Sequence, residues 1–142
     1  MIFDSFNPED TYNIGKDLGE KAQPGDVYLL FGDLGVGKTL FSQGFAKGLG
    51  IMEHVNSPTF TIVQEYTDGR LPFYHFDVYR IADEEEMEEI GFQDMIFGEG
   101  VCLIEWANLI QGILPDNCHE IRIEKDNSRG FEYRKISIQK GN

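Results

Sequence analysis

The chain has 142 residues, of which 25 are acidic and 12 are basic, so its formal net charge is −13. A content of 41% hydrophobic and 13% aromatic residues excludes a disordered chain, and the length predicts a single domain over residues 1–142. The acidic surplus argues against direct, tight binding to nucleic acid, because such binding depends on cationic contacts to phosphate.

No apolar run approaches the roughly 18 residues that a membrane-spanning helix needs. Residues 1–5 lack the basic segment and apolar core that begin a secretory signal. We therefore expect neither a membrane segment nor secretion. The two cysteines, Cys102 and Cys118, are too few for a disulfide framework, so a cytoplasmic protein with reduced thiols is the expectation.

The first predicted element is a helix that begins after Asn7. The Asn7 side chain can cap the helix, Pro8 suits its first position, and the acidic residues that follow suit the positive end of the helix dipole. Apolar residues then repeat at a spacing of four up to Ala22, which predicts one buried face. Turn-forming residues at 23–26 end the helix.

Residues 27–39 carry the pattern around which we interpret the rest of the chain. A short apolar run of strand formers, 27–31, is followed by G-x-x-x-x-G-K-T and then by a helical pattern, which is the context expected of a P-loop. Its backbone N–H groups and the helix N-terminus hold phosphates, its lysine reaches the β- and γ-phosphates, and its terminal hydroxyl ligates Mg²⁺. A glycine-rich turn that binds nothing is the alternative. The predicted nucleotide-binding residues here are Gly32, Asp33, Leu34, Gly35, Val36, Gly37, Lys38, Thr39 and Leu40, with Thr39 also at the metal.

The helix after this motif is predicted to run from about 38 to 49 and to end at Gly50. Gly44 and Gly48 weaken it, which predicts close packing of the helix against the sheet. Two strands are then predicted at 59–66 and 71–79. The short turn between them implies an antiparallel hairpin within the sheet.

An acidic helix is predicted over 83–90, either as a solvated face or as a docking surface, and a short helix follows around 92–97. The fully apolar run 101–104 predicts a central strand of a parallel sheet. We expect mainly loop over 107–117. The last two strands, at 119–125 and 131–138, form a second predicted hairpin.

Two carboxylates are the candidates for the catalytic part of the site. Glu105 follows the apolar strand, at the carboxyl end where ligands sit in open α/β sheets, and it is predicted to hold Mg²⁺ directly or through water. An ordinary surface acid is the alternative. Asp77 stands among aromatic residues of a strand, so it needs a partner. That partner is either the reacting water or metal-bound water, or Arg80 in a buried ion pair.

The segment 57–60 falls where a switch-type loop would sense the γ-phosphate, through the hydroxyl of Ser57 or Thr59, although a simple turn before a strand is equally consistent. Trp106 either stacks near the site, faces a partner or packs in the core. The three histidines show no metal-ligand spacing and are interpreted as structural: His54, His75 and His119.

Together these residues resemble the TsaE family (also called YjeE), small bacterial ATPases of tRNA threonylcarbamoyladenosine synthesis. The resemblance covers nearly the whole chain. The Glu105-Trp106 pair in place of a standard Walker B segment is specific to this family, whereas the P-loop alone is not. The segments that carry the resemblance are Gly32-Asp33-Leu34-Gly35-Val36-Gly37-Lys38-Thr39, Ser57-Pro58-Thr59-Phe60, His75-Phe76-Asp77-Val78-Tyr79-Arg80, Leu103-Ile104-Glu105-Trp106 and Leu114-Pro115.

The resemblance implies a three-layer α/β, P-loop NTPase-like fold that binds ATP and Mg²⁺, with a mixed sheet that includes the two antiparallel hairpins. It implies weak ATPase activity alone and stronger activity with the partner proteins TsaB and TsaD. In that system TsaD transfers the threonylcarbamoyl group to adenosine 37 of tRNA, so this chain would meet tRNA only indirectly.

The resemblance also assigns residues to roles. It implies Thr39 and Glu105 at the metal, and Asp77 and Trp106 as functional positions. With the P-loop lysine added, the predicted catalytic residues are Asp77, Glu105 and Lys38. Nucleotide contacts from Thr11 and Arg134 are implied too, although Phe131 stands where the family's last hairpin has a further basic residue.

Three other functions compete with a complex-serving ATPase. The main alternative is a small P-loop kinase that phosphorylates a small molecule, but the arginines form no cluster and no lid-length insertion is visible. A GTPase switch would need an Asn-Lys-x-Asp motif after a late strand, and none is present. A module that only binds ATP would not need Asp77 and Glu105.

Overall fold

A sheet of seven strands runs through the part of the chain that the structure, a computed structural model, describes: residues 1–33, 35–58 and 60–141. In chain order the strands are β1 (Ile2–Ser5), β2 (Val27–Gly32), β3 (Val63–Tyr66), β4 (Phe73–Asp77), β5 (Val101–Glu105), β6 (His119–Lys125) and β7 (Arg134–Gln139). Their order across the sheet is β1-β7-β6-β2-β5-β4-β3.

The sheet is mixed, as predicted. β2 runs parallel to both of its neighbours, β5 and β6, and β4 runs parallel to β5. β3 pairs antiparallel with β4, and β7 pairs antiparallel with β6 and β1. The parallel centre brings the carboxyl ends of β2, β4 and β5 to one edge of the sheet, where ligands bind in open α/β folds.

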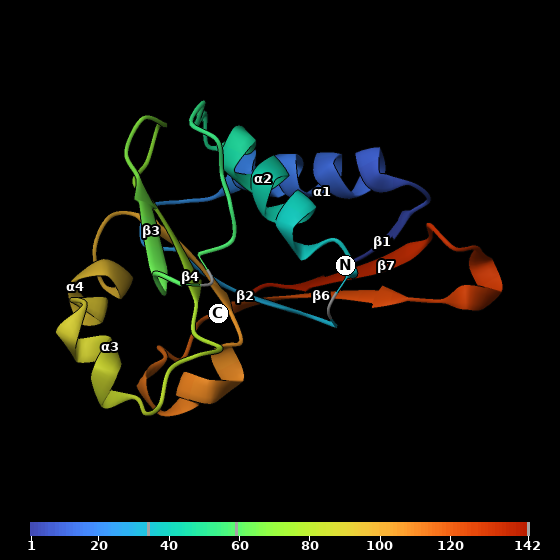
Figure 1. Cartoon of the computed structure of the whole chain (residues 1–142). Helices are drawn as coiled ribbons and strands as arrows, with labels where there is room; N and C mark the ends of the chain where they lie inside the picture. The colour runs from blue at the N-terminus through green and yellow to red at the C-terminus, as the bar shows by residue number, and fades with distance from the viewer. Residues whose placement is uncertain (34, 59, 142) are drawn as a thin grey trace.

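Helices cover the two faces of the sheet and make three layers (Figure 1). The upper layer in this view contains α1 (Pro8–Lys21) and α2 (Lys38–Gly48), and the lower layer contains α3 (Glu85–Glu89), α4 (Phe92–Ile96) and the 3₁₀ helix η1 (Ala107–Ile113). A short 3₁₀ turn, η2 (Asn127–Arg129), joins β6 to β7. None of the described helices has the length and apolar character needed to cross a membrane.

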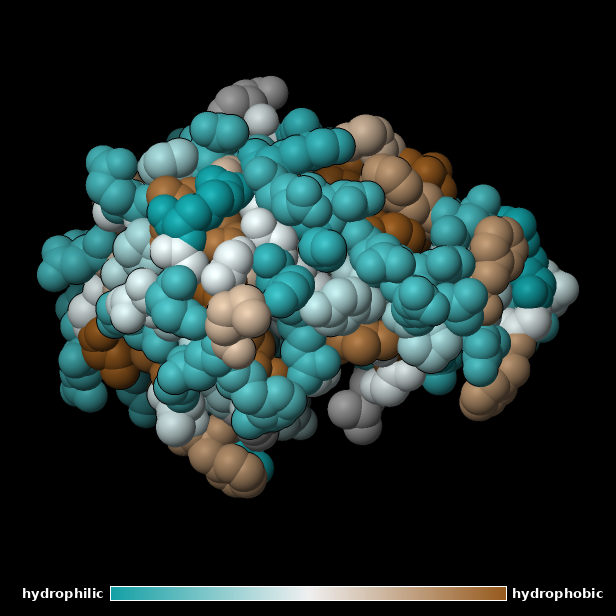
Figure 2. Space-filling model, turned by 90° about the horizontal axis from the view of Figure 1, so that it is seen from above, coloured by the Kyte–Doolittle hydropathy of each residue, from teal (hydrophilic) through white to brown (hydrophobic). Residues whose placement is uncertain are grey.

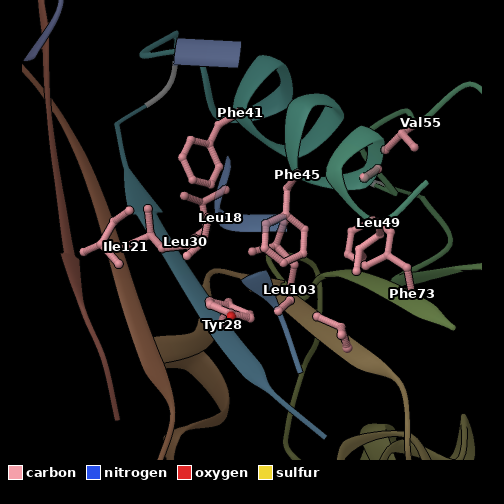
Figure 3. Close-up of a cluster of buried hydrophobic side chains, with 14 of the residues drawn as sticks. Leu18, Tyr28, Leu30, Phe41, Phe45, Leu49, Val55, Phe73, Leu103 and Ile121 are labelled. Carbon is pink, nitrogen blue, oxygen red and sulfur yellow. The ribbon is translucent and has the colours of Figure 1, made fainter. Parts of the chain in front are cut away.

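Alternate residues of the central strands contribute side chains to two hydrophobic cores, one on each face of the sheet. On β2, Tyr28 and Leu30 point into the core under α1 and α2, whereas Val27 and Leu29 point into the core over α3, α4 and η1. Because both faces of the central strands are buried, their sequences are continuous apolar runs. Figure 3 shows the first core, with Phe41 and Phe45 of α2 and Leu49 at its C-cap pointing toward the sheet. Viewed from above, hydrophilic side chains cover most of the helical face and hydrophobic residues form small, separate areas (Figure 2).

Several predicted elements are confirmed. The Asn7 side chain accepts a hydrogen bond from the Asp10 N–H at 2.8 Å and caps α1. The run at 101–104 is the fully buried β5, between β2 and β4. The helix predicted at 38–49 is α2. The acidic helix predicted over 83–90 is α3, and the short helix predicted around 92–97 is α4.

Other predictions were wrong at their boundaries. The strand predicted at 59–66 begins only at Val63, because the backbone turns before it and Ile62 has a left-handed φ of 68°. β4 ends at Asp77, two residues early, and β7 begins only at Arg134. The loop predicted over 107–117 contains η1, and β1 was not predicted.

The prediction that Gly44 and Gly48 pack against the sheet was also wrong. A methyl group at Gly44 would overlap the carbonyl oxygen of Tyr12 in α1, and one at Gly48 would overlap that of Lys16. The two glycines therefore let α2 approach α1, not the sheet. The missing signal was on the partner helix, where Gly15 and Gly19 have the same spacing of four.

Candidate functional site

The turn between β2 and α2 has the backbone that the P-loop pattern predicts. Gly35 and Gly37 adopt left-handed φ values of 81° and 105°, which residues with side chains rarely adopt. Gly37 is the N-cap of α2 and makes no side-chain capping bond. The N–H groups of the first turn of α2 can therefore donate to an anion, and the helix dipole favours negative charge at the same place.

A cavity of about 870 Å³ lies in front of this turn and joins the predicted site residues from distant parts of the chain. The P-loop and α2 line one side of it, and the ends of β4 and β5 line the other. The lining residues are Gly35, Gly37, Lys38, Thr39, Leu40, Gln43, Ser57, Asp77, Tyr79, Arg80, Glu105 and Trp106. The P-loop, both predicted carboxylates and Trp106 are thus brought together.

Two smaller cavities adjoin the same turn. One of about 460 Å³ is lined by Gly32, Asp33 and Lys38, together with Trp106. Another, of about 270 Å³, is lined by Thr11, Val36 and Arg134, among others. Each predicted site residue that the structure describes therefore lines a cavity at the P-loop. Leu34 and Thr59, which we also predicted here, lie outside the described residues.

Glu105 is held between two basic side chains. It is only 4% exposed. Its Oε1 atom lies 3.9 Å from Nζ of Lys38, and its Oε2 atom lies 2.8 Å from Nε2 of His75. Glu105 is the last residue of β5 and pairs in register with Asp77, the last residue of β4. The two carboxylates therefore lie side by side at the carboxyl edge of the sheet.

Asp77 has partners other than the one we considered as its structural alternative. Its Oδ2 accepts a hydrogen bond from Oγ of Ser57 at 3.4 Å, and its Oδ1 accepts one from the Tyr79 N–H at 3.1 Å. The Arg80 guanidinium instead lies 4.7 Å above the ring of Phe60. The ion pairs formed by the described residues do not include one between Asp77 and Arg80. A buried ion pair with Arg80 therefore does not explain the position of Asp77.

Trp106 forms part of the cavity wall. The Nζ atom of Lys38 lies 5.0 Å from the centre of the Trp106 ring, and the centre of the Tyr79 ring lies 4.7 Å from it. The half-buried ring also packs against the core of the lower layer, and a functional role for Trp106 stays a prediction. Trp106 and Ile62 are the two non-glycine residues of the described chain with positive φ. Both adjoin the carboxylates, where backbone strain is often retained for function.

Thr11 and Arg134, the other two predicted nucleotide contacts, both make hydrogen bonds within the protein. The Thr11 hydroxyl lies 2.7 Å from that of Ser5. Arg134 donates from Nε to the carbonyl oxygen of Val36 at 2.9 Å, and from its guanidinium to the carbonyl oxygens of Phe131 and Tyr133. Arg134 thereby ties the last hairpin to the P-loop backbone. A direct nucleotide contact from either residue stays a prediction.

The interpretation of the histidines missed one contact. His119 stacks on Tyr28, His54 is exposed, and neither lines the large cavity. His75, however, is fully buried against Glu105. The signal was in the sequence, because His75 and Asp77 are two apart on a strand and must face the same side.

The oxygen donors in the cavity fit Mg²⁺. The Thr39 hydroxyl is exposed in the first turn of α2, and Glu105 supplies a carboxylate on the opposite wall. The described residues contain no group of three or more His, Cys, Asp or Glu that could hold a metal ion by themselves. This donor set suits an ion that shares its coordination between one or two protein oxygens and substrate phosphates, which is the usual arrangement for Mg²⁺.

Comparisons with known proteins agree on one family. The family model described as "Threonylcarbamoyl adenosine biosynthesis protein TsaE" matches residues 5–136. A Bacillus subtilis (strain 168) protein named tRNA threonylcarbamoyladenosine biosynthesis protein TsaE is 55% identical over 132 residues, which are 93% of this chain and 80% of that protein. A Treponema pallidum (strain Nichols) protein of the same name is 45% identical over 112 residues, which are 79% of this chain and 82% of that protein.

A solved structure is similar throughout. The crystal structure of Bacillus subtilis YdiB matches with a TM-score of 0.85 and 43% sequence identity, and the match covers 100% of this chain and 86% of that one.

Proposed function

The chain belongs to the TsaE family, and from this premise we propose that it binds and hydrolyses ATP with Mg²⁺ in tRNA threonylcarbamoyladenosine biosynthesis. The observation that carries the proposal is the cavity of about 870 Å³, because it combines P-loop residues with two buried carboxylates. A P-loop alone positions phosphates, whereas hydrolysis also needs a metal-side carboxylate and a group that orients water.

Each side chain has a role that its position supports. The first-turn N–H groups of α2 hold the phosphates, and the Lys38 ammonium neutralises charge on the transferred group. Thr39 and Glu105 hold the Mg²⁺. When bound, this ion would neutralise negative charge on the phosphate oxygens. Asp77 orients the attacking water and accepts its proton, while Ser57 and the Tyr79 N–H fix the Asp77 carboxylate.

The chain acts with the partner proteins TsaB and TsaD and does not itself transfer the threonylcarbamoyl group. Its net charge of −13 supports an indirect encounter with tRNA, because a phosphate-binding surface needs an excess of basic side chains. ATP hydrolysis by this chain then serves the protein complex that carries out the transfer.

The test is Mg²⁺-dependent ATP hydrolysis by the purified chain, first alone and then with TsaB and TsaD. We expect slow hydrolysis alone, faster hydrolysis with the partners, and loss of both in the Lys38→Ala variant. Lys47→Ala is the matched control, because Lys47 is exposed near the other end of the same helix and does not line the large cavity. Fast hydrolysis that ignores the partners, or phosphate transfer to an added small molecule, would favour the kinase alternative.

A further inference from the structure

His75 is a fully buried histidine with one of its two ring nitrogens left without a partner among the described residues. It lies in the middle of β4 with no exposed surface, and its ring stacks on that of Phe73 at 5.9 Å. Its Nε2 atom is 2.8 Å from Oε2 of Glu105, whereas its Nδ1 atom is buried without a hydrogen-bond partner among the described residues. A buried polar atom without a partner costs free energy, so this arrangement requires an explanation.

The hydrogen bond runs from the imidazole to the carboxylate. Oε1 of Glu105 faces the Lys38 ammonium at 3.9 Å, and a carboxylate paired with an ammonium group only accepts hydrogen bonds. Nε2 of His75 must then donate. The described residues offer no partner to Nδ1, so Nε2 is the ring atom through which His75 forms a hydrogen bond.

Strand geometry fixes the side from which His75 approaches. In the parallel pair of β4 and β5, Asp77 pairs with Glu105 at the carboxyl edge. His75 pairs with Leu103, two residues before that edge. Alternate residues of a strand share a face, so His75 contacts Glu105 from behind, within the core. The ring therefore faces the carboxylate from the protein side, and His75 is not among the residues that line the large cavity.

We propose that His75 is a positioning residue for Glu105: its Nε2–H bond occupies Oε2 and leaves Oε1 as the oxygen presented to Lys38 and the cavity. The inference rests on the proposed function, in which Glu105 holds Mg²⁺. A carboxylate that is free to rotate can bind an ion through either oxygen or through both. Hydrogen-bond partners behind a metal ligand typically contribute 10- to 100-fold in metal affinity or activity.

Two substitutions separate this role from simple packing. The terminal amide of His75→Gln can place an N–H near the position of Nε2, whereas the shorter His75→Asn places its amide near the position of Nδ1. We expect His75→Asn to raise the Mg²⁺ concentration needed for half-maximal effect by roughly 10- to 100-fold. We expect His75→Gln to stay close to the wild type.

The readout does not require turnover. Trp106 is the one tryptophan of the sequence and lies at the site, so its fluorescence reports on Mg²⁺ binding in the presence of saturating ADP. The kcat for ATP and the free energy of unfolding in urea are measured on the same samples. His119→Asn is the control, because His119 stacks on Tyr28 away from the large cavity, and its Mg²⁺ dependence should match the wild type.

The outcomes separate the inference from the function on which it rests. If the wild type shows no Mg²⁺-dependent response with ADP, both are overturned. If the wild type responds and both His75 variants match it, or both are impaired equally, only the positioning role is overturned. The ring protons of the unmodified protein give a further check by ¹⁵N NMR. A proton on Nε2 supports the inference, and a proton on Nδ1 alone contradicts it.

Discussion

The interface between α1 and α2 is built from glycines, whereas the adjacent ends of β4 and β5 bury three ionisable side chains. In the first region, the glycines of each helix lie against the backbone of the other helix, so closely that a methyl group on any of them would overlap a carbonyl oxygen: Gly15, Gly19, Gly44 and Gly48. In the second region, His75, Asp77 and Glu105 are all buried. Both regions are tightly packed and flank the P-loop.

The two regions make opposite contributions to stability. Close backbone packing removes apolar surface from water and needs no side chain to be ordered, so it stabilises the fold. Burial of charged groups costs free energy unless each is paired, so the carboxylate region is expected to be neutral or unfavourable for stability. A neutral replacement at the strand ends should therefore cost activity, whereas a larger residue between the helices should cost stability. Each of the following variants tests one side of this contrast.

The largest effect is expected for Asp77→Asn. Loss of the proposed proton acceptor should reduce ATP hydrolysis by roughly 100-fold or more. The amide fits the same space, and its oxygen can still accept from Ser57 or from the Tyr79 N–H, so the free energy of unfolding should change little. Steady-state hydrolysis, the Trp106 fluorescence response to ADP with Mg²⁺, and urea unfolding measure the three quantities together.

Asp94→Asn is the matched control for this substitution, because Asp94 is exposed on α4 and remote from the cavity. It should leave hydrolysis and stability unchanged. If Asp77→Asn unfolds the protein or abolishes binding of ADP, the carboxylate is structural. If it hydrolyses ATP at the wild-type rate, another group orients the water.

The second effect is on stability. Gly44→Ala should lower the free energy of unfolding by about 2–3 kcal/mol, because the added methyl group overlaps the Tyr12 carbonyl oxygen and the helices must separate. Alanine is otherwise the better helix former by about 1 kcal/mol, so a destabilised variant cannot be explained by helix propensity. Urea unfolding measures the change, with Lys47→Ala on the exposed face of α2 as the control. A Gly44→Ala variant as stable as the wild type would mean that the helices are not in close contact.

A smaller effect on the free energy of unfolding is expected at the C-terminus of α1. Arg70, in the turn between β3 and β4, donates to the carbonyl oxygens of Gly19, Glu20 and Ala22 at 2.7, 3.0 and 2.8 Å. These bonds satisfy the carbonyl groups that a helix C-terminus leaves unpaired. Arg70→Ala should therefore lower the free energy of unfolding by about 1 kcal/mol, since the side chain is largely exposed. Arg70→Lys should recover part of this loss, and an unchanged stability in both variants would show that water replaces the bonds.

The parts of this molecule that could be predicted from sequence are those that local chemistry specifies. Asn7 and Pro8 mark the start of α1 because a helix N-terminus has its own hydrogen-bonding needs. The glycines and Lys38 mark the P-loop because a phosphate cradle needs a left-handed backbone and a cation. The apolar run before Glu105 marks β5 because both faces of a central strand are buried.

The parts that were missed depend on contacts between distant segments. β1 forms because Ile2 pairs with Ser137 of β7, and nothing in four isolated residues indicates that pairing. Gly44 packs against the backbone of Tyr12 and Lys16, so its partner can be identified only when α1 is considered together with α2. The spacing of His75 and Asp77 shows that they share a face, but His75 and Glu105 are 30 positions apart, so their contact also needs the register of β4 and β5.

The smallest expected effect concerns the reactivity of the two cysteines. Unlike the buried carboxylates, their thiols are uncharged in the folded protein. Cys102 lies on the same strand as Glu105 but faces the opposite core, and burial raises the pKa of its thiol to about 12. Burial also raises the pKa of Cys118 to about 11. A raised thiol pKa leaves little reactive thiolate below pH 9, so both cysteines should react slowly with maleimide at pH 8 in the folded protein.

Mass spectrometry after timed labelling measures this reactivity, and the same protein in urea serves as the control. Cys118 should react faster than Cys102, because it is only partly buried and its pKa is raised less. Rapid labelling of Cys102 in the folded protein would mean that β5 opens readily. The carboxyl edge that presents Glu105 would then be mobile as well, and a fixed carboxylate geometry at this site could not be maintained.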